Sequence, residues 1–133
     1  MQEFIHFFEK NRCGFLATID NGRPRVRPWS FLVEDNGKIW FLTTNKKRVF
    51  KQLKENPYIE FCSCSTEYIS ARLSGKIEFC NDMKIKERVL DERPILKEIY
   101  QSADNPLLES FYVGHGTLSL YSSRLGVDEF IEF

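Results

Sequence analysis

The sequence is organised around the stretch Thr43-Thr44-Asn45-Lys46-Lys47-Arg48-Val49-Phe50-Lys51-Gln52-Leu53-Lys54-Glu55-Asn56-Pro57. Hydroxyl and amide side chains at its start suit the N-cap of a helix. Val49, Phe50 and Leu53 then follow with helical spacing. A residue before proline disfavours the α conformation, so Asn56 ends the helix. The stretch therefore predicts a helix whose first turn carries Lys46, Lys47 and Arg48.

Three cations at a helix start are unusual, because the helix dipole already places positive charge there. Each exposed cation costs roughly 0.3–1 kcal/mol in that position. A bound anion would reverse the sign, and free N–H groups at helix N-termini are ready phosphate sites. Two interpretations follow: an anion site, or a solvated basic surface that tolerates the small penalty.

Strand-like runs surround this helix. They cover residues 14–19, 23–33, 38–42, 58–62, 68–79 and 111–121. Turn signals at Asp20-Asn21-Gly22 and at residues 34–37 join the first three into hairpins. Residues 68–79 alternate strictly between apolar and polar, which is typical of a half-buried antiparallel strand, and Gly75 is expected to allow a bend.

These patterns predict a mainly β (α+β) protein. Six antiparallel strands in a short chain should close into a small barrel, because closure removes exposed strand edges. Further helices are expected at residues 4–10 and from residue 83 to Tyr100, the latter capped by Asn81 or Asp82 and kinked at Pro94. At 133 residues, the chain is expected to form one domain.

The second predicted strand has an unusual composition. Arg23, Arg25 and Arg27 alternate with other residues, so a period of two places all three on one face. Pro24 and Pro28 cannot donate to a ladder, which predicts an edge or a bulge. Arg27 and the Lys47–Arg48 pair could converge on one anion, since a guanidinium binds phosphate oxygens bidentately.

Composition excludes several classes. Lys plus Arg equals Asp plus Glu at 19 each, which argues against a general nucleic-acid binder. No run approaches the roughly 18 apolar residues of a membrane helix, and the start lacks a signal peptide, so a cytoplasmic protein is expected. The four cysteines match no zinc or redox spacing, so we expect reduced thiols and no metal site.

Several motifs occur in a characteristic order. They are the pattern Arg27-Pro28-Trp29-Ser30, the strand end Phe41-Leu42-Thr43-Thr44, the basic helix start and the terminator Glu55-Asn56-Pro57. Together they resemble the pyridoxamine 5′-phosphate oxidase-like family of the FMN-binding split-barrel superfamily, which also holds general-stress and nitroimidazole-resistance flavoproteins. The resemblance runs from about residue 4 to residue 121. It implies a six-stranded antiparallel split β-barrel with flanking helices.

The resemblance also implies a set of FMN contacts. An arginine at the position of Arg27 and basic residues like Lys47 and Arg48 hold the FMN phosphate in the family. The flavin ring would be lined by Pro28, Trp29, Ser30, Leu42, Thr43 and Thr44. In the oxidase, the residue corresponding to Ser70 comes from the second subunit of a homodimer and reaches the flavin.

A homodimer is also expected from the aromatic content. A barrel of this size should not bury all its aromatic side chains, and a large exposed apolar patch marks an interface. The aromatics considered are Phe4, Phe7, Phe8, Trp29, Trp40, Phe61 and Tyr121. The non-core face of strand 68–79 carries Ser70, Arg72 and Ser74, which suit a ligand held by a neighbouring subunit.

The sequence departs from the family in two places. Val49 stands where the family has a lysine, and the tail at residues 124–128 has no tryptophan, so oxidation of pyridoxamine phosphate is not implied. No catalytic residue is assigned, although His115 is a candidate acid or base. The leading interpretation is an FMN-dependent oxidoreductase or reductase of a small molecule. The alternatives are a carrier or sensor of FMN or another phosphate-bearing ligand, and a structural dimer, while deazaflavin F420 and haem stay open as cofactors.

Overall fold

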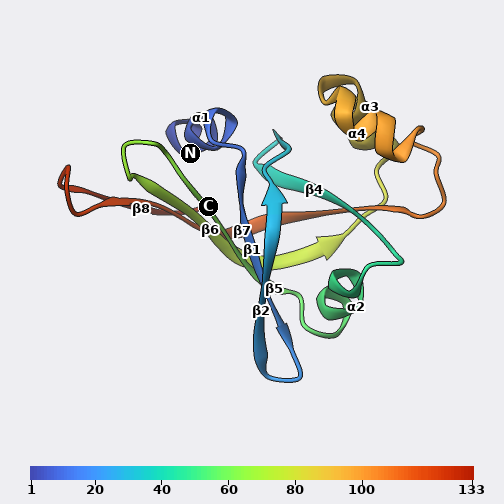
Figure 1. The fold of residues 1–133 in the computed structure, drawn as a ribbon, viewed down its shortest axis with the longest axis horizontal. Coiled ribbons are helices and arrows are strands. Elements are labelled where there is room, and N and C mark those ends of the chain that lie inside the picture. Colours follow the sequence, from blue (N-terminus) through green and yellow to red (C-terminus); the bar gives the residue numbers. More distant parts are fainter.

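The computed structural model describes residues 1–133 and is built on one antiparallel sheet of eight strands. They are β1 (Cys13–Asp20), β2 (Arg23–Ser30), β3 (Val33–Asp35), β4 (Lys38–Thr44), β5 (Tyr58–Cys64), β6 (Ser70–Phe79), β7 (Leu108–Ser122) and β8 (Val127–Glu132). Their order is β2-β1-β5-β6-β7-β4-β3, and β8 pairs with the second half of β7. No ladder joins β2 to β4, so the curled sheet stays open between them (Figure 1).

Four helices lie around the sheet: α1 (Gln2–Lys10), α2 (Arg48–Glu55), α3 (Met83–Glu92) and α4 (Pro94–Tyr100). Figure 1 shows α3 and α4 together, well away from α1, with α2 on its own below β4. The Asp82 side chain caps α3 by accepting from the Ile85 N–H at 3.1 Å, as predicted. Pro94 begins a new helix, because the residue before it cannot continue α3.

Both predicted hairpins are present, but the second strand is divided. Asn21-Gly22 and Asn36-Gly37 form two-residue turns with positive φ, between 50° and 77°. The predicted strand 23–33 is wrong in one respect: Phe31 and Leu32 leave the ladder between β2 and β3. Phe31 is fully buried instead. This division, together with a further strand β8 in the tail, raises the count from the predicted six to eight.

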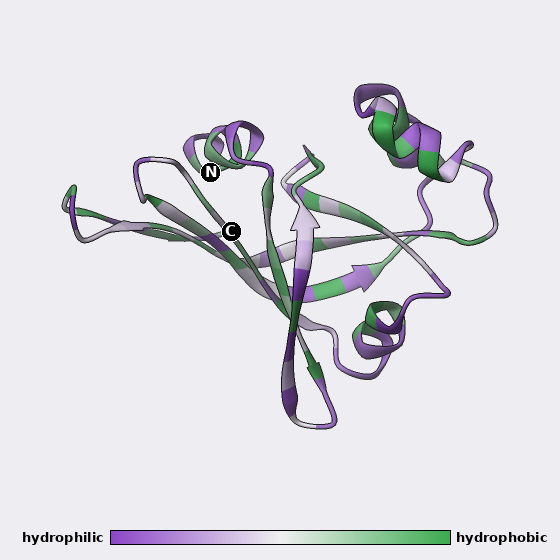
Figure 2. Cartoon of the chain, viewed as in Figure 1, coloured by the Kyte–Doolittle hydropathy of each residue, from purple (hydrophilic) through white to green (hydrophobic).

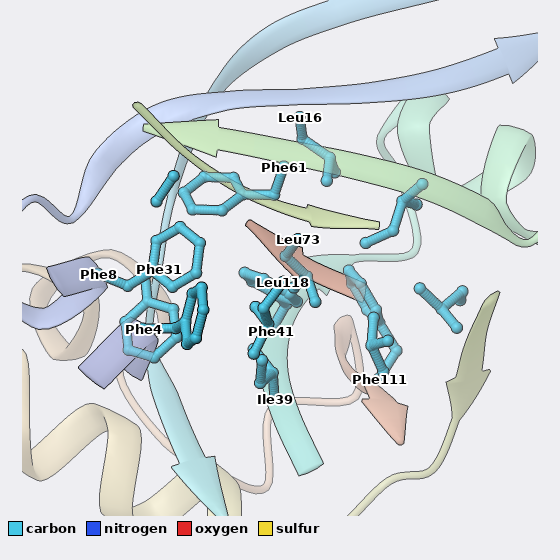
Figure 3. Packing of buried hydrophobic residues seen from close by; sticks show 14 of the residues in the cluster. Phe4, Phe8, Leu16, Phe31, Ile39, Phe41, Phe61, Leu73, Phe111 and Leu118 are labelled. Carbon is cyan, nitrogen blue, oxygen red and sulfur yellow. The ribbon is translucent and has the colours of Figure 1, made fainter. Parts of the chain in front are cut away.

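The core fills the inside of the curled sheet and extends under α3. Aromatic side chains from distant segments meet inside, with Phe8 of α1 stacked on Phe31 at 5.4 Å between ring centroids (Figure 3). A second cluster packs Trp40 and Leu42, on the opposite face of β4, against α3. β4 is therefore covered on both faces, which explains its continuous apolar run, while polar residues dominate the tip of the β1–β2 hairpin (Figure 2).

The fold meets the expectation about aromatic side chains in part. Of the seven considered, Phe4, Phe8, Trp40 and Phe61 are buried within the chain. Phe7 and Trp29 are half-buried and Tyr121 is 49% exposed, so the chain does not bury all seven. The outer face of the sheet also exposes Phe15, Val26 and Phe130.

Glycines mark two places where strands crowd. The register of β6 against β7 shifts between Gly75 and Ile77, which confirms the predicted bend.

No helix is long and apolar enough to cross a membrane, and all four thiols are free.

Replacing Gly14 with alanine is expected to destabilise the fold. A Cβ there would collide with the Cys62 carbonyl oxygen of β5 and press on the Phe61 ring. Strain of this kind typically costs about 1–3 kcal/mol, measurable as a lower urea midpoint. Gly114→Ala is the matched control, because its Cβ would meet only two carbons of the Tyr112 ring, at 3.2 and 3.5 Å. Equal midpoints for the two variants would contradict the prediction.

Candidate functional site

A cleft of about 170 Å³ lies at the opening between β2 and β4. It is lined by Pro28, Trp29, Ser30, Leu32, Leu42, Lys47, Leu96 and Tyr100. Pro28, Trp29, Ser30, Leu42 and Lys47 had been predicted as cofactor contacts, so half of the ten predicted residues meet in this one cleft.

The cleft exists because two strand edges face each other without pairing. β2 pairs only with β1, as its two prolines predict, and β4 beyond Trp40 pairs only with β7. Such edges present unpaired backbone N–H and C=O groups. Trp29 and Leu42 contribute apolar surface to the cleft beside these polar edges. A flat heteroaromatic ring needs this combination of apolar faces and a few fixed polar groups.

The start of α2 differs from the sequence prediction. β4 continues through Thr44, so the helix begins only at Arg48, and Lys47 occupies the N-cap without a side-chain capping bond. The predicted amide cap is wrong, because Asn45 instead donates to the Pro106 carbonyl at 3.1 Å and to Glu109 at 3.3 Å. The first N–H groups of α2 are therefore free of side-chain acceptors.

The basic residues at this helix start have no acidic partner. Lys46, Lys47 and Arg48 are exposed, and none forms an ion pair, whereas Lys51 lies 4.0 Å from Glu55. Lys47 lines the cleft beside Trp29, while Arg48 lines a neighbouring polar cavity of about 260 Å³. Unpaired positive charge and free helix N–H groups thus lie together at one end of the cleft.

Arg27 is already engaged within the chain. Its Nη2 donates to Gln52 Oε1 at 2.7 Å and its Nη1 to the Leu16 carbonyl at 3.1 Å. Thr18 donates to the same Gln52 oxygen at 2.6 Å. Burial lowers the pKa of Arg27. Arg27 therefore fastens α2 to β1 and β2, and it shares no cavity with Lys47. Sequence reasoning missed Gln52, whose role depends on tertiary contacts.

The other predicted residues do not line the cleft. Thr43 is fully buried and its hydroxyl has no hydrogen-bond partner, while the Thr44 carbonyl accepts from the Lys47 N–H at 3.2 Å in the turn before α2. Ser70 is on the outer face of β6, where its hydroxyl donates to the Tyr121 carbonyl at 3.5 Å. His115 is exposed on β7 and does not line the cleft.

Three cleft residues were missed from sequence: Leu32, Leu96 and Tyr100. Leu96 and Tyr100 lie one turn apart on α4 and close the cleft opposite β2. Their i, i+4 spacing was visible as a helical pattern, but it could not show which part of the sheet the helix would face.

Comparisons with known proteins agree with this architecture. The sequence model of the pyridoxamine 5′-phosphate oxidase family matches residues 1–113. A NimC/NimA family protein from Clostridium acetobutylicum is similar with a TM-score of 0.90 at 28% identity, over 100% of this chain and 92% of that one. General Stress Protein 26 from Bacillus anthracis gives 0.81 at 16% identity, over 99% and 97%.

A FAD-binding protein from Mesorhizobium loti gives a TM-score of 0.67 at 14% identity, over 98% of this chain and 91% of that one. No curated protein gives a significant sequence match. The structural likenesses confirm the predicted split-barrel fold.

Proposed function

The chain belongs to the pyridoxamine 5′-phosphate oxidase family, and we propose that it is a flavoprotein that binds FMN in the cleft between β2 and β4. The observation that carries this proposal is the pairing of an apolar, edge-lined cleft with the unpaired cation Lys47 at the free start of α2. The family includes flavin-dependent oxidases, and a relative of the same fold binds FAD.

The residues present fit FMN. Its phosphate would bind Lys47 and the uncapped N–H groups of α2, where an anion offsets the dipole of the helix. Its ring would lie along Trp29 and Leu42, with the free strand edges offering hydrogen bonds. FMN supplies electron transfer, while the protein supplies binding, orientation and exclusion of water.

We further propose an oxidoreductase or reductase that acts on a small molecule. The cleft lies under α4, whose Leu96 and Tyr100 leave an apolar space beside the proposed ring position. The second candidate function is a flavin carrier or sensor. It is favoured by the chemistry of the lining, which holds no histidine, carboxylate or thiol to act as an acid or base.

Reconstitution tests the flavin proposal. Purified protein incubated with excess FMN and desalted is expected to keep one FMN per chain and to show flavin absorbance. A colourless protein would overturn the proposal. A Soret band would identify haem as the cofactor in place of FMN, and an F420 spectrum would identify the deazaflavin. Turnover of reduced nicotinamide with an added electron acceptor then separates an enzyme from a carrier.

The size of the cleft supports the proposal that a second chain completes the FMN site. Sites for drug-sized ligands typically enclose about 300–1,000 Å³, and this cleft offers about 170 Å³. The outer face of β1, β2 and β8 exposes Phe15 by 57%, Val26 by 68% and Phe130 by 62%. We propose that a second copy packs on this face and that Ser70 or Arg72, on the outer face of β6, reaches the partner's FMN.

Light scattering of FMN-loaded protein at micromolar concentration is expected to give the mass of a homodimer. Phe15→Arg, which places a charge on the exposed outer face, should shift the protein to monomer and weaken FMN retention. Leu107→Arg is the control, because Leu107 is also exposed but precedes β7. A monomer that retains FMN would contradict the shared site.

A further inference from the structure

Two arginines beside the cleft converge on one carbonyl group. Arg12, at the start of β1, and Arg93, between α3 and α4, each donate from Nη1 to the Phe31 carbonyl at 3.2 Å. Arg12 Nη1 also donates to the Leu32 carbonyl at 2.8 Å. Two guanidinium groups therefore lie together at Phe31 and Leu32, the two residues that separate β2 from β3.

These two arginines lack the acidic partners that others have. Arg25, Arg72 and Arg88 each have a carboxylate oxygen within 4.0 Å. Arg12 and Arg93 are half-buried, form no ion pair, and leave their Nε and Nη2 groups without an acceptor in the chain.

The pairing of like charges is unfavourable without a counter-charge. Burial lowers the pKa of Arg93, the positive charge of Arg12 lowers it further, and the nearby Cys13 offsets part of this by raising it. Charges withdrawn from water are normally paired. The free N–H donors of both guanidinium groups are thus available to an anion, for which arginine is the best-suited side chain.

The arginine pair adjoins the cleft. Ser30 and Leu32, on either side of Phe31, both line the cleft, and so does Leu96, which follows Arg93 by three residues at the start of α4. Neither arginine lines the cleft itself, but Arg12 Nη1 lies 2.8 Å from the carbonyl oxygen of Leu32, a lining residue, and both arginines share the Phe31 carbonyl. Tyr100, one turn further along α4, extends the same apolar wall.

We propose that Arg12 and Arg93 bind the carboxylate or phosphate group of a small molecule whose apolar body lies against Leu32, Leu96 and Tyr100. The assignment of this molecule as the redox partner of the flavin rests on the proposed function. The anion site itself does not rest on the proposed function, because Arg12 and Arg93 belong to this chain and need no bound flavin to bind an anion. An anionic molecule with an apolar body is the class that this arrangement selects.

The first test uses the wild-type protein. Benzoate, its neutral analogue benzamide and phenyl phosphate are titrated calorimetrically into the protein with and without FMN. Benzoate or phenyl phosphate should bind at least tenfold more tightly than benzamide, because a charge-assisted hydrogen bond is lost in the neutral analogue. Tighter binding of one anion identifies the carboxylate or the phosphate as the preferred group. Equal binding of all three overturns the proposal.

The second test uses Arg12→Gln and Arg93→Gln, which keep an N–H donor for the Phe31 carbonyl but remove the charge. Each should weaken binding of the preferred anion about tenfold or more and leave benzamide unchanged. Arg124→Gln, an exposed arginine in the β7–β8 turn, is the matched control. Unchanged anion affinity in both variants overturns the proposal. If a variant fails to fold, the comparison in FMN-loaded wild-type protein, in which FMN occupies the site at Lys47, still decides.

The two proposals can fail separately. Arginine-dependent anion binding by a protein that does not retain FMN would overturn the flavin function and leave the anion site standing. FMN retention without any preference for anions would do the reverse.

Discussion

Replacing Lys47 with glutamate is expected to weaken FMN binding about a hundredfold. Lys47 is the one cation that lines the cleft, at the N-cap of a helix with no side-chain cap. Its loss removes a charge-assisted hydrogen bond to the phosphate, worth about 1.5–3 kcal/mol, and the new carboxylate repels the phosphate as well. Equilibrium dialysis or quenching of flavin fluorescence measures the change.

The same substitution should leave the fold intact or stabilise it slightly. An acidic residue near a helix N-terminus is favourable by roughly 0.3–1 kcal/mol. Affinity and stability are therefore expected to change in opposite directions, which separates a binding effect from unfolding. Lys84→Glu is the control: it makes the same change of charge at an exposed residue of α3 that does not line the cleft. It should leave FMN affinity within about twofold, because salt screens distant surface charges. Equal losses for the two variants would contradict a phosphate site at Lys47.

Local signals were sufficient for most of the sheet. The Asn-Gly turns predicted their hairpins because both residues accept the positive φ that such turns require. The alternation of residues 68–79 predicted β6 and its two faces, because one face is buried and the other is solvated. The two prolines of β2 predicted a strand with one free edge, and that edge is one wall of the cleft.

Tertiary contacts decided what the sequence left undetermined. The start of α2 was misplaced because Thr43 and Thr44 pair with β7, and this pairing outweighs their preference for a helix cap. Arg27 was expected at the phosphate; in the fold, Gln52 and the Leu16 carbonyl accept two of its N–H groups, a role that the sequence did not show, and its contact with a phosphate stays a prediction. Arg12 and Arg93 are 81 residues apart in sequence, so only the fold brings them together.

Replacing Phe8 with alanine is expected to cost about 3–5 kcal/mol of unfolding free energy, the usual range for removing a fully buried aromatic side chain. Phe8 has no exposed surface. Its ring stacks on Phe31 at 5.4 Å with an interplanar angle of 13° and lies 5.5 Å from Phe61 (Figure 3). The cavity left behind would lie between α1, β5 and the residues that follow β2. These segments can relax into it only in part, so most of the cavity cost remains.

Urea unfolding followed by tryptophan fluorescence measures this loss, since Trp29 and Trp40 report on both core clusters. Phe7→Ala is the matched control, because Phe7 is only half-buried and meets Phe8 edge-to-face at 6.4 Å. Its loss should stay below about 2 kcal/mol, in proportion to the smaller apolar area it buries. If both variants lose the same stability, α1 is held by its surface contacts and not by the aromatic stack. If Phe8→Ala costs the larger amount, the stack anchors α1 and also fixes Phe31, whose carbonyl holds the two arginines beside the cleft.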